Sequence, residues 1–374
     1  MHVGFLTDVA LPYVSGVTVA VQRQRDALRA AGVSVTVVGP HGDVDLAEPD
    51  LQVPGAPAGY RIALFRPRLA SRLRSRGVDR LHAHSVFGAS WAALAAARTL
   101  RVPFIVTVHT RFDEYAHYAG LAAPIARTLA GPYTGAVVAA ADLALAPCEE
   151  LARELREAGD APSVRVVAAP VDPKLAGGDA TRGRARVQVT PDAPLLLSVS
   201  RLAVEKRPAD LVHALAAMRR RDVMLVFAGA GPLATELRET AARAGVGSRV
   251  ILAGQLAPPD LADAFAAADA VVSASRSETQ GLALCEAAAA GRLVIAPDRG
   301  GYAEVLEHER GGLFPSRAPS GEELAAAMDR ALDDASLRQR IADEARYRAD
   351  VSWSPRAVAG ALRDAYTAAE AMTE

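Results

Sequence analysis

Short apolar runs alternate with longer segments of helical periodicity along most of the chain. The first unit combines the run HVGFLTD, a helix predicted from about Val17 to Ala30, and the run SVTVVG, with Gly32 as the helix stop. Four more apolar runs follow, DRLHAHS, PFIVTVH, LALAP and VRVVAA, with helical stretches between most of them. Strands alternating with helices form parallel sheets covered on both faces, so this half predicts a Rossmann-like α/β domain.

The alternation breaks between Pro170 and Pro194, a segment with four prolines, a Gly-Gly pair and several charges. It then restarts with PLLLSVS, VMLVFAG, RVILAG, DAVVSAS and RLVIAP, again separated by helices. We therefore predict an α/β protein with two Rossmann-like domains, residues 1–170 and 171–350, whose sheets face a cleft between them. Residues 351–374 hold a last helix, from about Ser354 to Ala371, that the pattern assigns to neither half.

The loops that directly follow strands hold the distinctive residues, which is where open α/β sheets bind ligands. The most distinctive is SRSETQGLALCEAAAAG, residues 275–291. Glu278 lies in the loop, Gly281 opens the helix, and Glu286 follows inside it, so helical rise separates the carboxylates by roughly 10 Å. That span resembles the distance from the hexose to the ribose of a sugar nucleotide. The backbone N–H groups of residues 279–282 can bind an anion at the helix N-terminus.

In isolation, two glutamates eight positions apart would indicate a capped surface helix with solvated side chains. The buried strand before them and the apolar helix after them favour a binding site instead.

Arg201 and Lys206 lie in the loop SVSRLAVEKRPADL, where both can reach a pyrophosphate. Gly16 allows close approach of a phosphate or sugar, although a lone glycine there is more often structural. His109 ends a strand and can contact the hexose; the alternative is a histidine satisfied in the core.

Composition excludes several functions. The net charge of −1 predicts no general affinity for nucleic acid. Two cysteines, Cys148 and Cys285, are too few for a disulfide framework or a zinc site, and they favour a reducing cytoplasm. Asp43 and Asp45 match a metal-binding Asp-x-Asp pattern but lie in a polar loop. His82 and His84 lack a third zinc ligand, so we expect strand-end histidines facing the cleft and no metal site.

Two further expectations concern the membrane. The N-terminal run lacks a basic leader and is interrupted by Asp8, so it predicts a first strand, not a signal peptide. The longest uncharged stretches are shorter than a membrane span and predict buried helices.

Together these residues resemble family 4 of the retaining glycosyltransferases, which have the GT-B fold, from Gly4 to about Trp353. The Glu-x7-Glu motif is the most specific part of the resemblance. It implies metal-independent hexosyl transfer with retention, a nucleotide-sugar donor with UDP-hexose favoured over GDP-hexose, no cofactor, and a last helix that returns to the N-terminal domain. The catalytic residues it implies are Glu278, His109, Arg201 and Lys206. The donor-binding residues are Gly16, Arg201, Lys206, Gly231, Gln255, Glu278, Thr279, Gln280, Gly281, Leu282 and Glu286.

Within the family, TDVALPYVSGVTVAV and HTRFDEYAHY look most like the bacterial diacylglycerol glycosyltransferases, although mannosyltransferases share much of the first motif. The segment YRIALFRPRLASRLRSRGVDR, residues 60–80, holds seven arginines and one acid. Such a basic, partly amphipathic segment can lie on an anionic leaflet, with solvated arginines as the alternative. The predicted membrane contacts are Arg66, Arg68, Arg72, Arg74 and Arg76, with Leu64, Phe65, Leu69 and Leu73 as apolar contacts.

Three functions are therefore open. The first is a lipid glycosyltransferase, peripheral on the inner face of the cell membrane. The second is the same enzyme class acting on a sugar, polyol phosphate or polysaccharide. The third, a dinucleotide oxidoreductase or a nucleotide binder without catalysis, is weakened because the first turn lacks Gly-x-Gly-x-x-Gly.

Overall fold

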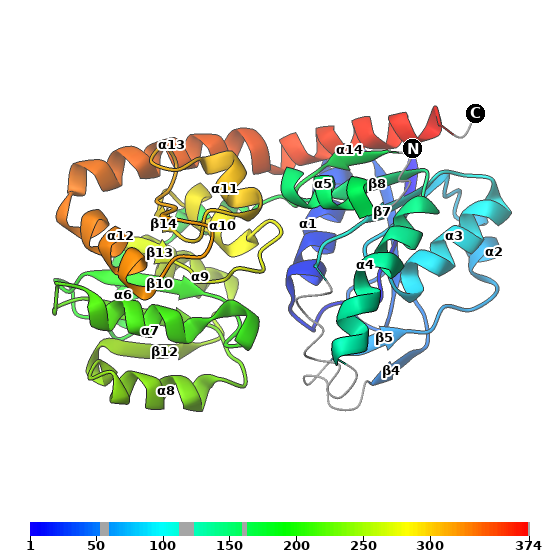
Figure 1. The fold of residues 1–374 in the computed structure, drawn as a ribbon. Helices are drawn as coiled ribbons and strands as arrows, with labels where there is room; N and C mark the ends of the chain where they lie inside the picture. Colours follow the sequence, from blue (N-terminus) through cyan, green and yellow to red (C-terminus); the bar gives the residue numbers. More distant parts are fainter. Residues whose placement is uncertain (53–59, 112–122, 159–162, 373–374) are drawn as a thin grey trace. The chain divides into compact units, whose positions relative to one another are not determined.

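The apolar runs of the sequence form the strands of two parallel sheets, one in each of two units of the chain (Figure 1). The computed structural model describes residues 1–52, 60–111, 123–158 and 163–372. Unit 1 comprises Met1–Pro170 and Pro355–Glu374, and unit 2 comprises Val171–Ser354. The predicted α/β fold is confirmed, because both sheets are parallel and each predicted apolar run contributes a strand.

Unit 1 has a seven-stranded sheet in the order β3-β2-β1-β6-β7-β8-β9. The strands are β1 His2–Leu6, β2 Ser34–Gly39, β3 Leu46–Ala47, β6 Arg80–Ala83, β7 Phe104–Thr107, β8 Leu143–Ala146 and β9 Val164–Val166. The helices are α1 Gly16–Ala30, α2 Leu69–Arg74, α3 Gly88–Leu100, α4 Ala123–Ala139, α5 Glu149–Ala158 and α14 Pro355–Glu370. A small antiparallel pair, β4 Asp50–Gln52 and β5 Arg61–Ala63, lies outside the main sheet.

Unit 2 has a five-stranded sheet in the order β12-β11-β10-β13-β14. The strands are β10 Leu195–Val199, β11 Met224–Ala228, β12 Val250–Gly254, β13 Ala270–Val272 and β14 Leu293–Ile295. The helices are α6 Ala180–Arg186, α7 Pro208–Ala217, α8 Ala234–Arg243, α9 Pro258–Ala267, α10 Leu282–Ala289, α11 Gly300–Leu306, α12 Gly321–Asp333 and α13 Ala335–Trp353, with short 3-10 turns η2 Pro173–Gly177, η3 Val204–Lys206 and η4 Gly247–Arg249.

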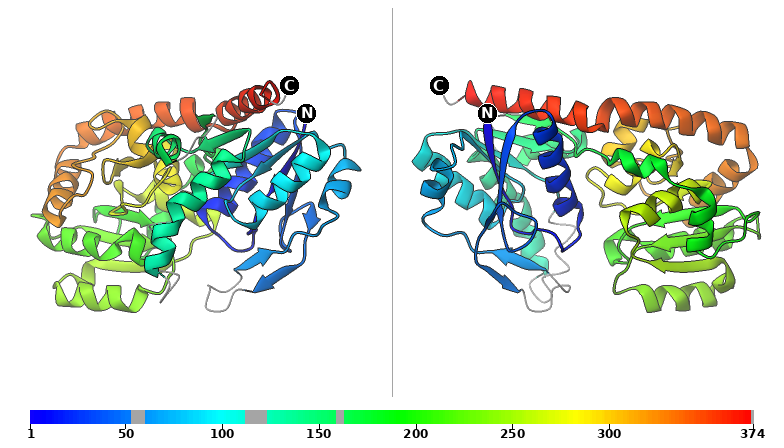
Figure 2. Two further views of the ribbon diagram at one scale, coloured as in Figure 1. Left: turned by 45° about the vertical axis from the view of Figure 1, so that its right-hand side comes forward. Right: turned by 180° about the vertical axis from the view of Figure 1, so that it is seen from behind.

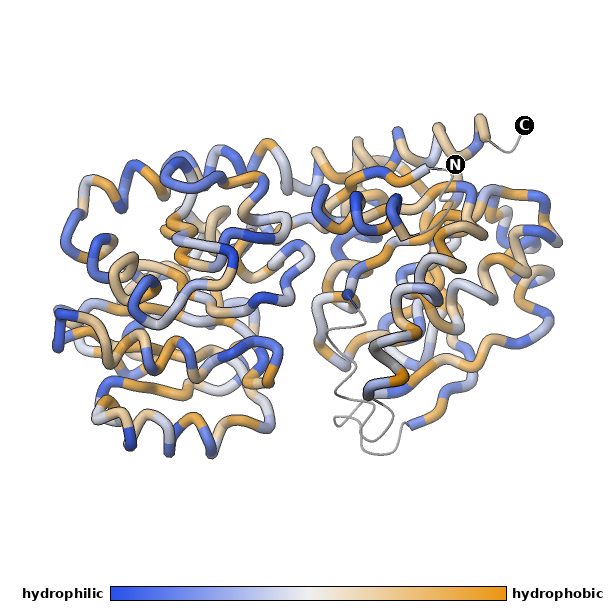
Figure 3. Tube along the Cα trace, in the orientation of Figure 1, coloured by the Kyte–Doolittle hydropathy of each residue, from blue (hydrophilic) through white to orange (hydrophobic). Residues whose placement is uncertain are grey.

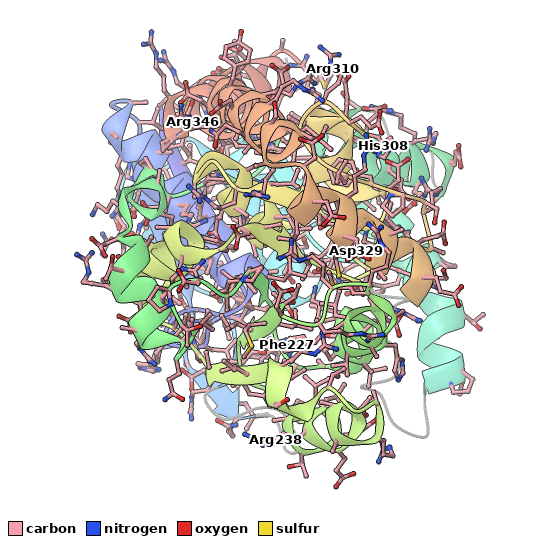
Figure 4. All side chains as sticks on the ribbon, turned by 90° about the vertical axis from the view of Figure 1, so that its left-hand side faces the viewer. Phe227, Arg238, His308, Arg310, Asp329 and Arg346 are labelled. Carbon is pink, nitrogen blue, oxygen red and sulfur yellow. The ribbon has the colours of Figure 1, made fainter. Side chains whose placement is uncertain are left out.

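The core of unit 2 consists of aliphatic side chains that the buried strands share with the flanking helices. Phe227 on β11 lies among interior side chains, whereas Arg238 on α8 points outward (Figure 4). Strands buried on both faces carry nearly continuous apolar sequence, which explains why β10, β11, β13 and β14 were recognisable without clear alternation.

The last helix, α14, packs in unit 1 against α1 (Figure 2). Its apolar face joins Phe5 and Val35 in one buried cluster through Val358, Leu362 and Tyr366. The sequence pattern alone assigned this helix to neither half, because an amphipathic stripe records that a helix is covered but not by what.

The Pro/Gly-rich connector contains more structure than its composition predicts. Residues 173–177 form η2 and residues 180–186 form α6, which packs on α9 within unit 2. Contact is close because Gly183 lacks a side chain: a Cβ there would lie 2.0 Å from the carbonyl oxygen of Asp263. The break in the pattern therefore marks the start of unit 2 and not a bare linker.

Candidate functional site

The loops after β10 and β13 are joined by an ion pair between Lys206 and Glu278. Lys206 Nζ donates to Glu278 Oε1 at 2.7 Å, and both side chains are mostly buried. Lys206 ends the short turn η3, and Glu278 lies four residues before α10. Because β10 and β13 are neighbours in a parallel sheet, their carboxyl ends place these two loops side by side.

Glu278 is held as a carboxylate by its surroundings. Burial by itself would raise the Glu278 pKa, but the Lys206 ammonium and a hydrogen bond from the Ser275 side chain outweigh it, so the pKa lies below its ordinary value. An ionised Glu278 therefore fixes the position of the Lys206 ammonium group.

Arg201 belongs to the same constellation through Glu205. Arg201 Nη2 donates to Glu205 Oε1 at 2.6 Å, four positions along the loop, and the Glu205 side chain is almost fully buried. The Ser277 hydroxyl donates to the Glu205 carbonyl at 3.3 Å, which ties the β10 loop to the loop that carries Glu278. Sequence reasoning missed Glu205 and Ser277, although the four-residue spacing from Arg201 to Glu205 was a usable signal.

The entry to α10 requires glycine. Gly281 has φ +74°, and a Cβ there would lie 2.4 Å from the ring of Tyr302. Gly300 approaches the same loop from the other side, since its Cβ would lie 2.6 Å from the Glu278 carbonyl oxygen. Leu282 is the first residue of α10, so its backbone N–H lies at the N-terminus of that helix.

The remaining predicted donor residues lie on the same sheet edge or on α10. Gly231 follows β11 and rests on the β10 loop, where a Cβ would lie 2.3 Å from the Leu202 carbonyl oxygen. Gln255 follows β12 and is exposed. Glu286 and Gln280 are buried, the latter with its amide 3.9 Å from Cys285 Sγ. Thr279 accepts a 2.7 Å hydrogen bond from the Gly301 backbone N–H at its own carbonyl.

Two predicted residues lie in unit 1. Gly16 is the first residue of α1, after a capping box formed by Ser15 and Thr18, and a Cβ built at Gly16 would meet nothing within 4 Å. His109 follows β7, and its Nε2 lies 3.2 Å from His84 Nδ1. Burial lowers the pKa of His109 to about 4, so His109 is neutral at physiological pH. Most of the HTRFDEYAHY motif, from Phe112 onward, lies outside the described residues.

The prediction that His82 and His84 face a cleft is wrong, because both side chains are fully buried. His82 hydrogen-bonds through Nδ1 to the Tyr366 hydroxyl at 2.8 Å and through Nε2 to the Thr107 hydroxyl at 2.6 Å. Two polar partners in unit 1 thus satisfy a histidine in the core. The spacing of His82 and His84 along a strand indicates that they share one face of the sheet. It does not indicate whether a helix covers that face.

The aspartates of the Asp-x-Asp pattern serve the local fold. Asp43 pairs with Arg25 at 2.9 Å, and Asp45 with Arg29 at 2.7 Å. In the part of the chain that the structure describes, no group of three or more His, Cys, Asp or Glu side chains is arranged to hold a metal ion.

The arginine-rich segment is partly internal. Leu69 and Leu73 on α2 are buried in the unit 1 core, so they do not supply the apolar contacts predicted for a membrane. Arg66 and Arg72 both pair with the buried Glu48, the first at 2.9 Å. The other predicted contacts, Arg68, Arg74 and Arg76, are exposed. No helix among the described residues is long and apolar enough to cross a bilayer.

Two glycosyltransferase family models match this chain, one over most of each unit. The family model described as Glycosyltransferase Family 4 matches residues 14–175, and the model described as Glycosyl transferases group 1 matches residues 180–348. The α-monoglucosyldiacylglycerol synthase of Streptococcus pneumoniae is 28% identical over 313 residues, covering 79% of this chain and 71% of that protein. The GDP-mannose-dependent α-mannosyltransferase of Corynebacterium glutamicum is 31% identical over 356 residues, covering 89% and 81%.

Solved structures share the fold over almost the whole chain. Sucrose-phosphate synthase from Thermosynechococcus elongatus has a TM-score of 0.77 at 22% identity and covers 98% of both chains. Anabaena HepE in complex with UDP has a TM-score of 0.78 at 20% identity, covering 97% of this chain and 99% of that one. The two family matches, the curated relatives and these folds agree, so the chain belongs to the family 4 glycosyltransferases and has the GT-B fold.

Proposed function

We propose that this chain is a retaining, metal-independent hexosyltransferase that moves a hexose from a nucleotide sugar, with UDP-hexose favoured, to diacylglycerol on the inner face of the cell membrane. The observation that carries the donor half of this proposal is the Lys206–Glu278 pair in front of α10. It fixes one cation beside one carboxylate at the carboxyl edge of the sheet, where nucleotides bind in such folds.

The proposed chemistry places the donor diphosphate against Lys206, Arg201 and the N-terminus of α10. The bond between the anomeric carbon and the diphosphate oxygen breaks, and its electron pair stays on the diphosphate. The two cations and the backbone N–H groups of α10 stabilise that charge, which other enzymes neutralise with a metal ion. The acceptor hydroxyl attacks from the face that the diphosphate leaves, and its proton passes to a phosphate oxygen.

Glu278 positions the hexose in this scheme, and Glu286, buried on α10, binds the ribose. Glu278 is ionised and already paired with Lys206. It can therefore accept hydrogen bonds from sugar hydroxyls while it keeps the ammonium in place. His109, which follows β7 in unit 1 and is neutral near physiological pH, is the fourth residue that we assign to catalysis.

The lipid acceptor is supported by relatives. The proteins similar to this chain include α-monoglucosyldiacylglycerol synthases of Streptococcus pneumoniae and of Acholeplasma laidlawii, the second 24% identical over 336 residues. A second candidate is transfer of mannose from GDP-mannose to an acceptor that is not a membrane lipid. The GDP-mannose-dependent α-mannosyltransferases of Corynebacterium glutamicum and Mycolicibacterium smegmatis, 31% and 30% identical, favour GDP-mannose as the donor in this second candidate.

A donor panel followed by an acceptor screen separates these functions. Thermal unfolding is measured with UDP-, GDP- and ADP-sugars, and the donor that stabilises most is then tested with diacylglycerol in vesicles and with water-soluble sugars. The proposal expects the largest shift with a UDP-hexose and a labelled glycolipid product of retained anomeric configuration, formed also in EDTA. Stabilisation by GDP-mannose with product from a water-soluble acceptor would establish the second candidate. Nucleotide binding without hydrolysis or transfer would leave only a nucleotide-binding protein.

A further inference from the structure

Five large apolar side chains form an exposed ridge on unit 1, which we call the α3–α4 ridge. Phe87 precedes α3, Trp91 lies one turn later, and Ile125, Leu129 and Tyr133 follow one another at four-residue spacing along α4. Their exposed fractions range from 37% to 64%. Four-residue spacing keeps the α4 members on one helix face, and α3 and α4 both carry apolar colour in Figure 3.

The aromatic members hold one another in place. Trp91 Nε1 donates to the Tyr133 hydroxyl at 2.8 Å, and the rings of Phe87 and Tyr133 stack with centroids 6.1 Å apart. The ridge is thus a preformed surface shared by two helices. Trp and Tyr rings with one polar atom each suit the level of lipid headgroups, where one end is apolar and the other is wet.

Arginine is the only type of charged residue in the helices α2, α3 and α4. The sequences of α2, α3 and α4 contain no aspartate or glutamate, but they contain Arg72, Arg74, Arg98 and Arg127. The basic helix α2 packs directly against α3, with Arg74 Nη2 donating to the Thr99 carbonyl at 3.3 Å. The acids nearest in the fold lie on α5, which packs against α4 and carries Glu149 and Glu154. An apolar ridge whose own helices carry arginines and no acids complements a surface that is apolar inside and anionic outside.

The ridge also begins at the functional edge of the unit 1 sheet. Phe87 follows β6 and α4 follows β7, which are adjacent parallel strands. Helices that follow parallel strands start at the carboxyl edge of the sheet, and His109 lies two residues beyond β7 at the same edge. An acceptor with acyl chains could therefore keep its chains on the ridge while its hydroxyl lies near His109.

We infer that the α3–α4 ridge is the surface through which unit 1 enters an anionic lipid bilayer and over which a lipid acceptor reaches His109. The inference rests on the proposed lipid acceptor but assigns the apolar contact to α3 and α4. The leucines of α2 cannot supply it, since they are buried in the core. The exposed arginines in and beside α2, which are Arg68, Arg74 and Arg76, then contribute the electrostatic part of binding.

Trp91 reports on this contact directly. The chain has two tryptophans, and the other, Trp353, is buried on α13 in unit 2. The full chain is mixed with phosphatidylcholine–phosphatidylglycerol vesicles, with and without brominated phosphatidylcholine. Trp91 emission should shift to the blue and be quenched by the brominated lipid, and a Trp91→Phe variant should lose the quenched component. Vesicle-bound protein whose emission is neither shifted nor quenched would overturn the inference, as would capture of the ridge by another protein with no vesicle binding.

A matched pair of double variants tests the aliphatic part. Ile125→Gln with Leu129→Gln removes side chains exposed by 64% and 57%, and Tyr347→Gln with Val351→Gln removes side chains on α13 exposed by 67% and 57%. The first variant loses two aliphatic side chains that would be buried in the bilayer, so its partitioning into vesicles should weaken at least about tenfold. The second should partition as the wild type does, and the thermal shift with the donor should be unchanged in both. Equal partitioning of both variants would refute the inference.

Failure of the ridge and failure of the proposed function are distinguishable. Diacylglycerol glycosylated in detergent micelles, together with unquenched Trp91, would overturn the ridge and leave the lipid acceptor standing. Quenched Trp91 without any glycolipid product would remove the acceptor proposal and support the ridge as a membrane surface.

Discussion

Lys206 Nζ lies 2.7 Å from Glu278 Oε1, although the two residues are 72 positions apart in the chain. The pair joins the two loops that hold the candidate donor site. It also makes each partner's charge depend on the other, because a buried carboxylate without its cation would take up a proton more easily.

Replacing Lys206 should therefore damage donor chemistry more than stability. Lys206→Met removes the ammonium that we propose stabilises the departing diphosphate, and we expect kcat/KM to fall by about 10²–10³-fold. Lys174→Met is the control, since Lys174 is the only other lysine and is exposed on η2. Steady-state kinetics with the best donor measure both variants, and equal activity in the two would contradict the assignment.

The same substitution should move the acid limb of activity. The Glu278 pKa lies below 4.5 in the folded protein, so its ionised form is favoured by folding above that pH and this stabilisation is lost as the pH falls. In Lys206→Met the burial of Glu278 is no longer opposed by a neighbouring ammonium, and its pKa should rise. The pH profile of kcat/KM should lose activity at higher pH than the wild-type profile does. Lys206→Arg, which keeps the charge, should retain the wild-type limb.

Two glycines should respond to alanine in opposite ways. Gly231→Ala puts a Cβ about 2.3 Å from the Leu202 carbonyl oxygen, so we expect a loss of roughly 1–3 kcal/mol in unfolding free energy along with donor binding. Gly16→Ala meets nothing within 4 Å and should leave stability unchanged or slightly higher. Urea denaturation measures the unfolding free energy of each variant, and steady-state kinetics measure how each variant uses the donor. A Gly16→Ala enzyme with wild-type kinetics would show that nothing approaches this backbone closely.

The buried histidines should make unit 1 sensitive to mild acid. Burial lowers the pKa of His109 to about 4 and those of His82 and His84 well below 6.5. Between pH 6.5 and about 4 the histidines bind protons in the unfolded chain but not in the folded chain. Their contribution to the unfolding free energy is therefore fully present above about pH 6.5 and is lost as the pH falls towards 4. The loss should be on the order of 1 kcal/mol per pH unit for each histidine. Urea denaturation at several pH values measures it.

The control for this effect is His213→Gln, since His213 is exposed on α7. This variant should keep the wild-type dependence of unfolding free energy on pH. His82→Gln should reduce the dependence, because one of the three protons is no longer taken up on unfolding. A flat wild-type profile between pH 7 and 5 would mean that the histidines are not neutral in the core.

Tyr366→Phe should loosen the last helix. It removes a hydroxyl that hydrogen-bonds to His82 at 2.8 Å inside the core, leaving a buried ring nitrogen without that partner. We expect a loss of roughly 1–3 kcal/mol in unfolding free energy and faster proteolysis within α14. Tyr347→Phe on α13 removes an exposed hydroxyl and serves as the control. Equal protease resistance in the two variants would argue against this anchor.

Much of the fold could be predicted from local pattern. Each apolar run became a strand in a parallel sheet, because strands covered on both faces must be apolar along their own length. Gly32, with φ +80°, ended α1 as expected of a glycine after a helix. The candidate donor loops were recognisable for the same reason, since Arg201, Lys206 and Glu278 lie in loops that directly follow such runs.

What the sequence determined by itself was the order of strands and helices and the type of residue at each strand end. Only the tertiary structure decided which of these residues meet. It paired Lys206 with Glu278, enclosed His82 between Thr107 and Tyr366, and turned the leucines of α2 into the core while α3 and α4 kept exposed apolar side chains. The local pattern of apolar residues indicates which positions along a helix or strand are buried. Contacts between distant elements depend on how whole sheets and helices pack, and no short stretch of sequence contains that information.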